Sequence, residues 1–151
     1  MDVSVCNQQS RLQVDEALLI EAATGVLSSA GFRGGALSIA VVDDPTIHEL
    51  NRRHLNHDYA TDVLSFVLEE DEQQLEGEVI VSADTAHRNA DGYGWSAENE
   101  LLLYVIHGVL HLVGYRDKTD DERSAMRIAE ATHLARCGVA LPSCEQGAPE
   151  R

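Results

Sequence analysis

The sequence is poor in basic residues. Its 151 residues include 11 Lys and Arg against 26 Asp and Glu, which gives a formal net charge of −15 at pH 7. Proteins that bind nucleic-acid phosphates normally use clustered Lys and Arg, so the overall charge argues against such a partner. Six of the acids lie in the segment EEDEQQLEGE (69–78), which predicts a solvated loop. Arg52 and Arg53 form a basic pair beside His54 and His57, so a local positive groove is not excluded.

Long apolar runs and paired cysteines are also missing. No stretch of about 18 uncharged apolar residues occurs, so we expect no transmembrane helix and no membrane partner. The first residues, MDVSVCNQQSRLQV, have no basic head before a long apolar core, so we expect no secretory signal. Cys6, Cys137 and Cys144 are odd in number and form no CxxC pair, which argues against a disulfide framework. These features favour a reducing, cytoplasmic location.

The length and the 44% hydrophobic content are typical of one globular domain. Alternating or β-branched segments predict strands at 3–7, 36–44, 62–70 and 77–82, and the acidic loop joins the last two as a hairpin or a crossover. Helical spacing predicts helices over about 14–32, 44–55, 82–95, 97–113 and 119–136. We therefore expect an α+β fold in which a small mixed sheet of about four strands packs with about five helices. The domain should span 1–138, with 139–151 as a flexible tail.

The predicted helix starts rest on capping residues. Asp44 followed by Pro45 predicts an N-cap with proline at the first helical position. Ser96 predicts the N-cap of the helix over 97–113, which is apolar nearly all round and should be the central buried helix. Thr119 and Glu122 have the spacing of a capping box.

Two histidines lie four residues apart in the segment HGVLHLVGYRD, which runs from His107 to Asp117. Residues four apart on a helix share one face, so His107 and His111 are spaced to bind one metal ion, as in zinc proteases. Gly108 stands where those proteases have their general-base glutamate, which argues against protease chemistry. Gly114 can turn the chain back and carry Asp117 near the same ion. Three protein ligands leave one open position, as in a catalytic zinc site.

Spacing alone leaves a second interpretation open, in which both histidines are hydrogen-bonded core residues of an apolar helix. Burying two imidazoles among apolar side chains costs free energy unless both find partners. One cation satisfies both rings, and the glycine followed by an acid supplies what a third ligand needs. These observations favour the metal site.

The segment HGVLHLVGY resembles the signature of the YbeY family of bacterial rRNA maturation endoribonucleases, H-G-x-L-H-L-x-G-Y-D-H. The segment ELNRRHLNHDYATDVLSF is similar to the family's L-N-x-x-Y-R-x-x-D-x-P-T-D-V-L-S-F, and LEGEVIVS is similar to its L-G-D-I-x-I-S strand. The three blocks agree in order and spacing over about residues 36–135. The resemblance implies a single-domain, zinc-dependent enzyme that processes small-subunit rRNA, including the 3′ end of 16S rRNA, and serves ribosome quality control. It also implies RNA and the small ribosomal subunit as partners.

The chain departs from the family pattern at two places. The resemblance carries over His107 and His111 as ligands, but Asp117 stands at the family's third histidine and Arg116 at its aspartate. A carboxylate is an accepted zinc ligand, yet its charge makes the bound water less acidic and makes Mn²⁺ or Fe²⁺ better candidates than with three histidines. The family's arginine in the middle block, which is thought to serve cleavage, falls on Leu55. Its proline falls on Ala60.

The resulting hypothesis is a single-strand-specific endoribonuclease whose metal polarises a phosphate oxygen or activates water. Arg53 or Arg116 would stabilise the charge of the phosphorane. Asp58 and Asp62 are the nearest candidates for a general base, although Asp62 more often would cap the chain before the strand.

Further candidates have ordinary structural interpretations. Ser65 could face the site, but a buried hydroxyl bonded to the backbone is favoured. Trp95 and Tyr93 could stack on bases, but a tryptophan that anchors a loop is commoner. Surface positions are the default for the remaining histidines, of which the last is the weakest rival for a third ligand: His48, His54, His57, His87 and His133.

Two other functions stay open. The leucine at the family's arginine position motivates a non-catalytic ribosome-assembly factor with a structural metal. Two histidines and one carboxylate also make the non-haem iron triad, which motivates an oxygenase-like site. The blocks outside the metal motif do not call for that chemistry.

Overall fold

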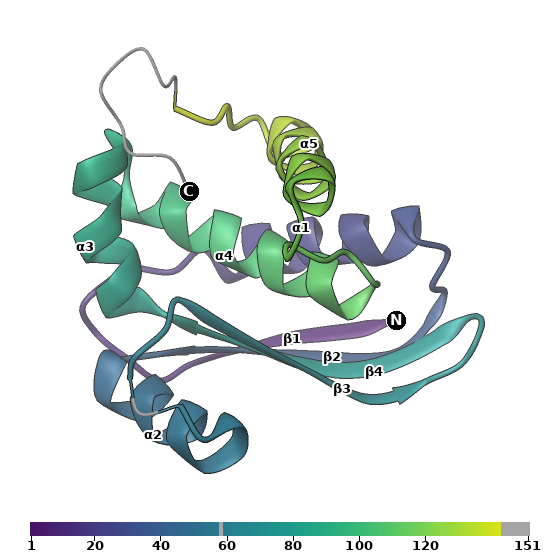
Figure 1. Cartoon of the computed structure of the whole chain (residues 1–151), viewed down its shortest axis with the longest axis horizontal. Coiled ribbons are helices and arrows are strands. Elements are labelled where there is room, and N and C mark those ends of the chain that lie inside the picture. The colour runs from purple at the N-terminus through teal and green to yellow at the C-terminus, as the bar shows by residue number, and fades with distance from the viewer. Residues whose placement is uncertain (58, 143–151) are drawn as a thin grey trace.

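Figure 1 shows the computed structural model, which describes residues 1–57 and 59–142. Four strands form one sheet within these residues, in the order β1 (Asp2–Asn7), β2 (Gly34–Val42), β4 (Gln74–Ser82) and β3 (Val63–Glu70). The first two pairings are parallel and the last is antiparallel. The predicted mixed sheet is therefore confirmed. The loop predicted for the acidic segment 69–78 is wrong in its extent, because 69–70 belong to β3 and 74–78 belong to β4. Only 71–73 form a hairpin turn, in which Asp71 accepts hydrogen bonds from the N–H groups of Gln73 and Gln74.

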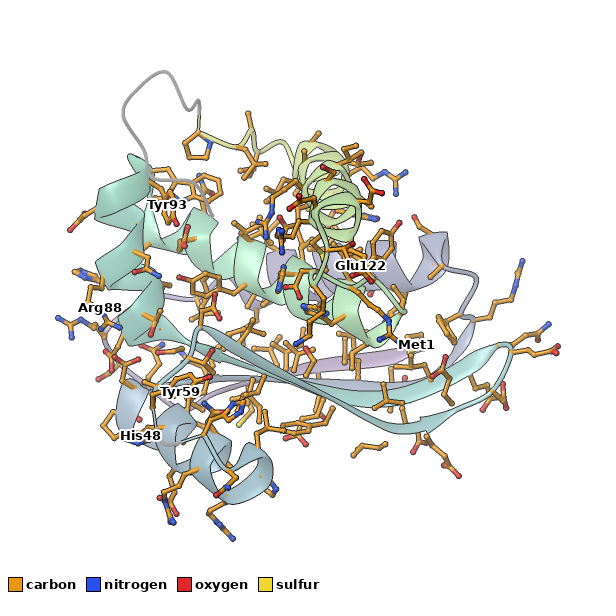
Figure 2. The ribbon with its side chains drawn as sticks, in the orientation of Figure 1. Met1, His48, Tyr59, Arg88, Tyr93 and Glu122 are labelled. Atoms are coloured by element: carbon orange, nitrogen blue, oxygen red, sulfur yellow. The ribbon has the colours of Figure 1, made fainter. Side chains whose placement is uncertain are left out.

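Five helices of the described residues cover the two faces of the sheet unequally. α1 (Glu16–Ser29), α3 (Ala83–Tyr93), α4 (Ala97–Leu112) and α5 (Asp120–Arg136) lie on one face (Figure 1). α2 (Asp44–Leu55) lies alone on the other face, where Figure 2 also shows His48 and Tyr59. The α+β fold that the sequence predicts is confirmed, including the order of its elements.

α4 is the central buried helix, as its sequence predicts. Eleven of its residues are buried, and the apolar ones form the main core with apolar side chains of α1, β2, β4 and α5. Gly108 brings this helix close to the sheet, because a Cβ there would lie 2.8 Å from Val79 Cγ1 and 2.9 Å from Val63 Cγ2. A second, smaller core under α2 contains Ile47, Leu64 and Ile80. Apolar side chains of the sheet are thus buried on both of its faces, against α4 on one side and against α2 on the other.

The capping residues fix the starts of three helices. Ser96 accepts a hydrogen bond from the N–H of Asn99 at 3.1 Å, and Thr119 forms the predicted capping box with Glu122. The prediction of Asp44 as an N-cap is wrong. Asp43 caps α2, and its carboxylate accepts from the N–H of Thr46 at 2.9 Å.

Asp44 instead joins α2 to α3. Its carboxylate accepts hydrogen bonds from Ser82 Oγ at 2.6 Å, Thr85 Oγ1 at 2.7 Å and the Arg88 guanidinium at 2.8 Å. Burial works to raise the pKa of Asp44, but these three hydrogen bonds outweigh it and hold the pKa below its usual value. These tertiary partners explain why the side chain is not available to cap its own helix.

Only the first part of the predicted C-terminal tail is described. Val139 and Leu141 pack against the main core, and the Val139 N–H donates to the carbonyl of Leu134 at 2.9 Å. Residues 143–151 lie outside the described residues. The domain boundary at residue 138 and the flexibility of the tail stay predictions.

Candidate metal centre

His107, His111 and Asp117 come together at the end of α4. The Nε2 atoms of His107 and His111 lie 2.9 Å apart. Asp117 Oδ2 lies 3.6 Å from the Nε2 of His107 and 3.4 Å from the Nε2 of His111. Gly114 adopts a φ of +107°, in the left-handed region, and so turns the chain back at the end of the helix. All three residues are partly buried.

Each imidazole is oriented through its other ring nitrogen. His107 Nδ1 lies 2.6 Å from Glu130 Oε2, and His111 Nδ1 lies 3.0 Å from the backbone carbonyl oxygen of Tyr115. A carbonyl oxygen and an ionised carboxylate only accept hydrogen bonds, so both Nδ1 atoms are the donors. In a ring whose only proton is on Nδ1, the Nε2 atom has a bare lone pair.

This arrangement fits a metal ion. Two lone pairs that face each other at 2.9 Å repel unless a proton or a cation lies between them, and the Asp117 carboxylate adds a negative charge beside them. Imidazole nitrogen and carboxylate oxygen are ligands of Zn²⁺, and also of Mn²⁺ and Fe²⁺. A hydrogen bond from the second ring nitrogen to a carboxylate or carbonyl is the usual support of a histidine ligand. The three residues could therefore hold one metal ion.

Glu130 and Arg127 of α5 were not predicted from the sequence. Glu130 is fully buried, and its second oxygen, Oε1, lies 2.6 Å from Arg127 Nη1. A buried carboxylate without such partners would be strongly destabilising. The available sequence signal was an acid on the apolar face of α5, between Met126, Ala129 and Leu134.

A pocket of about 310 Å³ opens beside the triad. Its polar lining comes from α3, α4, α5, the residue before β3 and the turn after α4, and it includes Asp62, Asn89, His107, Asp117, Arg127 and Glu130. Tyr104 also lines the pocket, and burial, followed by the charge of Glu100 and a hydrogen bond to it, raises the pKa of the Tyr104 hydroxyl. The phenol is therefore neutral at every physiological pH.

Gly108 and Ser65 explain why a protease-type base is absent. The face of α4 at Gly108 lies against β3 and β4, so a glutamate side chain has no room there. Ser65 Oγ donates to the Gly108 carbonyl at 2.9 Å, which matches the favoured interpretation of a hydroxyl bonded to the backbone. Asp62 Oδ1 accepts from the Val63 N–H at 2.9 Å and thus begins the strand, while the side chain also lines the pocket. Asp58 lies outside the described residues.

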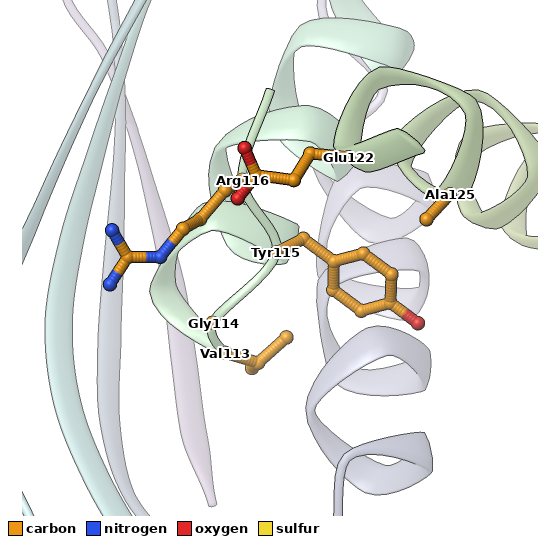
Figure 3. Close-up of a pocket in the computed structure, with 6 residues that line it drawn as sticks. All are labelled: Val113, Gly114, Tyr115, Arg116, Glu122 and Ala125. Carbon is orange, nitrogen blue, oxygen red and sulfur yellow. The ribbon is translucent and has the colours of Figure 1, made fainter. Parts of the chain in front are cut away.

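The structure places the two predicted catalytic arginines differently. Arg53 is exposed on α2, on the face of the sheet opposite α4 (Figure 1), so it is not brought to the triad. Arg116 is exposed and precedes Asp117. It lines a separate pocket of about 350 Å³ with Tyr115 and Glu122, and Figure 3 shows the side chains of Arg116 and Tyr115 pointing in opposite directions. The arginine that lines the pocket beside the triad is Arg127.

The other aromatic and histidine candidates lie outside the triad. Trp95 Nε1 donates to Glu100 at 2.8 Å, so this tryptophan anchors its loop on the core. His54, His57 and His87 are exposed and His48 is half-buried. The expected surface position of His133 is wrong: its residue is 8% exposed, because it lies on the apolar face of α5. Burial and the charge of Arg136 lower the pKa of this imidazole.

Comparisons with known proteins place the chain among endoribonucleases. The family model described as "Endoribonuclease YbeY" matches residues 4–138. The chain is 40% identical to a Rhodopirellula baltica endoribonuclease YbeY over 93% of this chain and 74% of the relative. It is 41% identical to the endoribonuclease YbeY of Pelotomaculum thermopropionicum over 92% of this chain and 99% of the relative. These relatives are named as endoribonucleases rather than oxygenases.

The fold also matches a solved structure. The solution structure of a Thermotoga maritima protein superimposes with a TM-score of 0.58 at 24% identity, over 89% of this chain and 90% of that chain. That match supports the architecture alone. Within residues 1–57 and 59–142, no helix has the length and apolar content needed to cross a membrane.

Proposed function

Because the chain belongs to the YbeY endoribonuclease family, a family of nuclease hydrolases, we propose that it is a metal-dependent endoribonuclease that cuts single-stranded RNA. Its proposed substrate is small-subunit rRNA, at the 3′ end of 16S rRNA, and its proposed partner is the small ribosomal subunit. Ribosome assembly and quality control on this subunit would place the protein in the cytoplasm. The observation that carries the proposal is the facing pair of Nε2 atoms of His107 and His111 beside Asp117.

The metal ligands in this proposal are His107, His111 and Asp117, and the metal is Zn²⁺, with Mn²⁺ and Fe²⁺ as alternatives. A metal bound there supplies Lewis-acid polarisation of a phosphate oxygen and lowers the pKa of water. The protein's own contribution is to fix the orientation and the tautomer of the two histidine ligands. Glu130 keeps the proton of His107 on Nδ1, and the Tyr115 carbonyl does the same for His111.

Arg116 is the proposed cation for the phosphate. It is exposed, and it adjoins Asp117 in the chain, so its guanidinium can meet a phosphate that arrives from solvent. A guanidinium stabilises negative charge on a phosphate through paired N–H donors. Arg127 is not the proposed cation for the phosphate, because its guanidinium forms an ion pair with Glu130 at 2.6 Å. We do not extend the proposal to Arg53, which lies across the sheet.

A second candidate function is a non-catalytic assembly factor whose metal is structural. Leu55 favours it, because this residue stands where the family pattern has an arginine, and it is 45% exposed at the end of α2. A leucine there gives no charge to a phosphate. The two functions differ in whether the metal-loaded protein cuts RNA at all.

The experiment measures cleavage of a labelled single-stranded oligoribonucleotide by the metal-loaded full chain, beside a duplex of the same sequence. We expect the single strand to be cut and the duplex to remain intact. His111→Ala should abolish cleavage because it removes a ligand, while His87→Ala, an exposed histidine of α3, should leave it unchanged. Equal cleavage by His111→Ala identifies a contaminant and overturns the nuclease proposal. Bound metal without any cleavage favours the assembly factor.

A further inference from the structure

The pocket beside the triad contains hydrogen-bond acceptors that the metal centre does not use. Three carboxylates line it: Asp62, Asp117 and Glu130. Both oxygens of Glu130 are engaged, by His107 and by Arg127, and Asp117 faces the two histidines. Asp62 differs from them. Its Oδ1 accepts from the Val63 N–H at 2.9 Å and from Thr61 Oγ1 at 3.2 Å, whereas its Oδ2 has no hydrogen-bond partner among the described residues.

Asn89 presents a second acceptor to the same pocket. Its Nδ2 donates to the Tyr104 hydroxyl oxygen at 3.0 Å. That hydroxyl donates a hydrogen bond to the buried carboxylate of Glu100, which also accepts from Trp95 Nε1 at 2.8 Å. Tyr104 can therefore only accept from Asn89, which fixes the amide with its NH₂ group toward the phenol. The Asn89 Oδ1 atom is left without a donor in the part of the chain that the structure describes.

We infer that Asp62 and Asn89 form a ribose-reading subsite, in which Asp62 Oδ2 and Asn89 Oδ1 are acceptors for 2′-hydroxyls of the RNA, each hydroxyl donating its one hydrogen to one of them. The inference rests on the proposed function, and it adds the residues that tell RNA from DNA. A ribose hydroxyl is a donor that deoxyribose lacks, and a site with fixed acceptors rejects a ligand that leaves them unpaired. Two acceptors with fixed orientations and no donor of their own therefore select for a hydroxyl.

The position of the pocket favours the sugar over the base. His107 and Asp117 line the pocket and also belong to the triad, so a phosphate held at the triad puts its attached ribose into the adjoining space. The base is farther from the phosphate along the nucleotide. The amino groups of cytosine, adenine and guanine are also donors, however, so the experiment must distinguish a ribose hydroxyl from a base amino group.

The test measures binding of octamers to the metal-loaded full chain by fluorescence anisotropy, with a gel run beside each titration to verify that the RNA stays intact and circular dichroism to verify folding. The octamers are oligouridylate with ribose, with 2′-fluororibose and with deoxyribose. Uracil has no exocyclic amino group, and 2′-fluororibose can accept but not donate at the 2′ position. We expect the ribose octamer to bind roughly tenfold more tightly than the 2′-fluoro octamer, the effect of a hydrogen bond to a charged acceptor.

Asp62→Asn is the sharpest variant, because it keeps the oxygen that accepts from Val63 and replaces the free acceptor by an NH₂ donor. We expect the ratio between ribose and 2′-fluoro binding to fall below about threefold, the loss of one such acceptor. Asn89→Leu, of similar shape, should lower the same ratio. Asp71→Asn is the matched control, because it also removes one negative charge from an aspartate that accepts from backbone N–H groups. Asp71 lies in the hairpin turn between β3 and β4. The ratio cancels the general effect of the lost charge on RNA affinity.

Equal binding of the two octamers by the natural protein, or a ratio that survives both Asp62→Asn and Asn89→Leu, would overturn the inference. Tighter binding of oligocytidylate than of oligouridylate in both sugar forms, without a preference for ribose, would assign the acceptors to a base amino group instead. Cleavage by the metal-loaded protein is assayed separately. RNA that is cut without any 2′ preference in binding contradicts the subsite alone, and a 2′ preference without cleavage contradicts the nuclease function alone.

Discussion

The Nε2 atom of His107 lies 2.9 Å from the Nε2 atom of His111, while the Nδ1 atom of each ring is held by an acceptor from a different segment. Glu130 of α5 holds the first ring, and the backbone of the turn after α4 holds the second. Both rings are therefore fixed in the tautomer that a metal ligand needs. The metal affinity should depend on residues that do not touch the ion.

Glu130→Gln is expected to weaken metal binding by about tenfold to a hundredfold, the usual effect of removing the partner of a histidine ligand. The amide is a weaker acceptor than the carboxylate, so the His107 tautomer and ring orientation are less well fixed. The measurement is competition with a chromophoric chelator. The ¹⁵N chemical shifts of His107 report the tautomer in the metal-free protein.

Glu49→Gln is the control for that experiment. Glu49 forms an ion pair with Arg52, three residues later on the same helix, and Glu130 forms one with Arg127, three residues earlier. Glu49, however, is exposed on α2. Its substitution should leave the metal affinity unchanged. An unchanged affinity in Glu130→Gln as well would show that Glu130 has only a structural role.

Gly108→Ala is expected to destabilise the fold by about 1–2 kcal/mol. The new methyl group would lie 2.8 Å from Val79 Cγ1 and 2.9 Å from Val63 Cγ2, and such overpacking costs about 1–3 kcal/mol. The better helix propensity of alanine offsets up to about 1 kcal/mol of it. Urea denaturation gives the free energy of unfolding. Gly92→Ala in α3 has open space around its Cβ and should be neutral or slightly stabilising, and a loss of similar size there would contradict the packing argument.

The local features of the site were predictable because they depend on short spacings. The four-residue interval of His107 and His111, the reversal at Gly114 and the arrival of Asp117 all follow from helix geometry and one glycine. The capping box at Thr119 was predictable for the same reason. In each case, the residues that interact lie within ten positions of each other.

The parts that were missed depend on contacts between distant segments. Glu130 meets His107 across 23 residues, and only the packing of α5 on α4 brings them together. Asp44 was predicted as a cap because its partner Ser82, 38 residues away, cannot be inferred from local sequence. The strand order β1-β2-β4-β3 could not be predicted for the same reason, because the hydrophobic pattern predicts which segments are strands but not which strands pair.

Asp117→His, which introduces the residue of the family pattern, is expected to shift metal preference from Mn²⁺ toward Zn²⁺. Imidazole favours zinc, whereas a carboxylate also suits harder ions. We expect the ratio of the Zn²⁺ and Mn²⁺ affinities to rise by roughly tenfold, measured by calorimetric titration. Asp117→Ala should weaken binding of both ions. An unchanged ratio in Asp117→His would exclude Asp117 as a ligand.

His133 makes stability depend on pH. Burial, with the charge of Arg136, holds the pKa of this imidazole below its usual value of 6.5. Below about pH 6.5 the unfolded chain therefore binds a proton at this residue that the folded chain does not, so stability falls as the pH falls and levels off below the folded pKa. His133→Leu should remove this contribution, because leucine fits the buried apolar face of α5 and does not titrate. The free energy of unfolding, measured with EDTA at pH 7.5 and 5.5, should fall less in the variant than in the natural protein. All other titrating groups are common to both proteins and cancel in that difference, so an equal fall in both would contradict the assignment to His133.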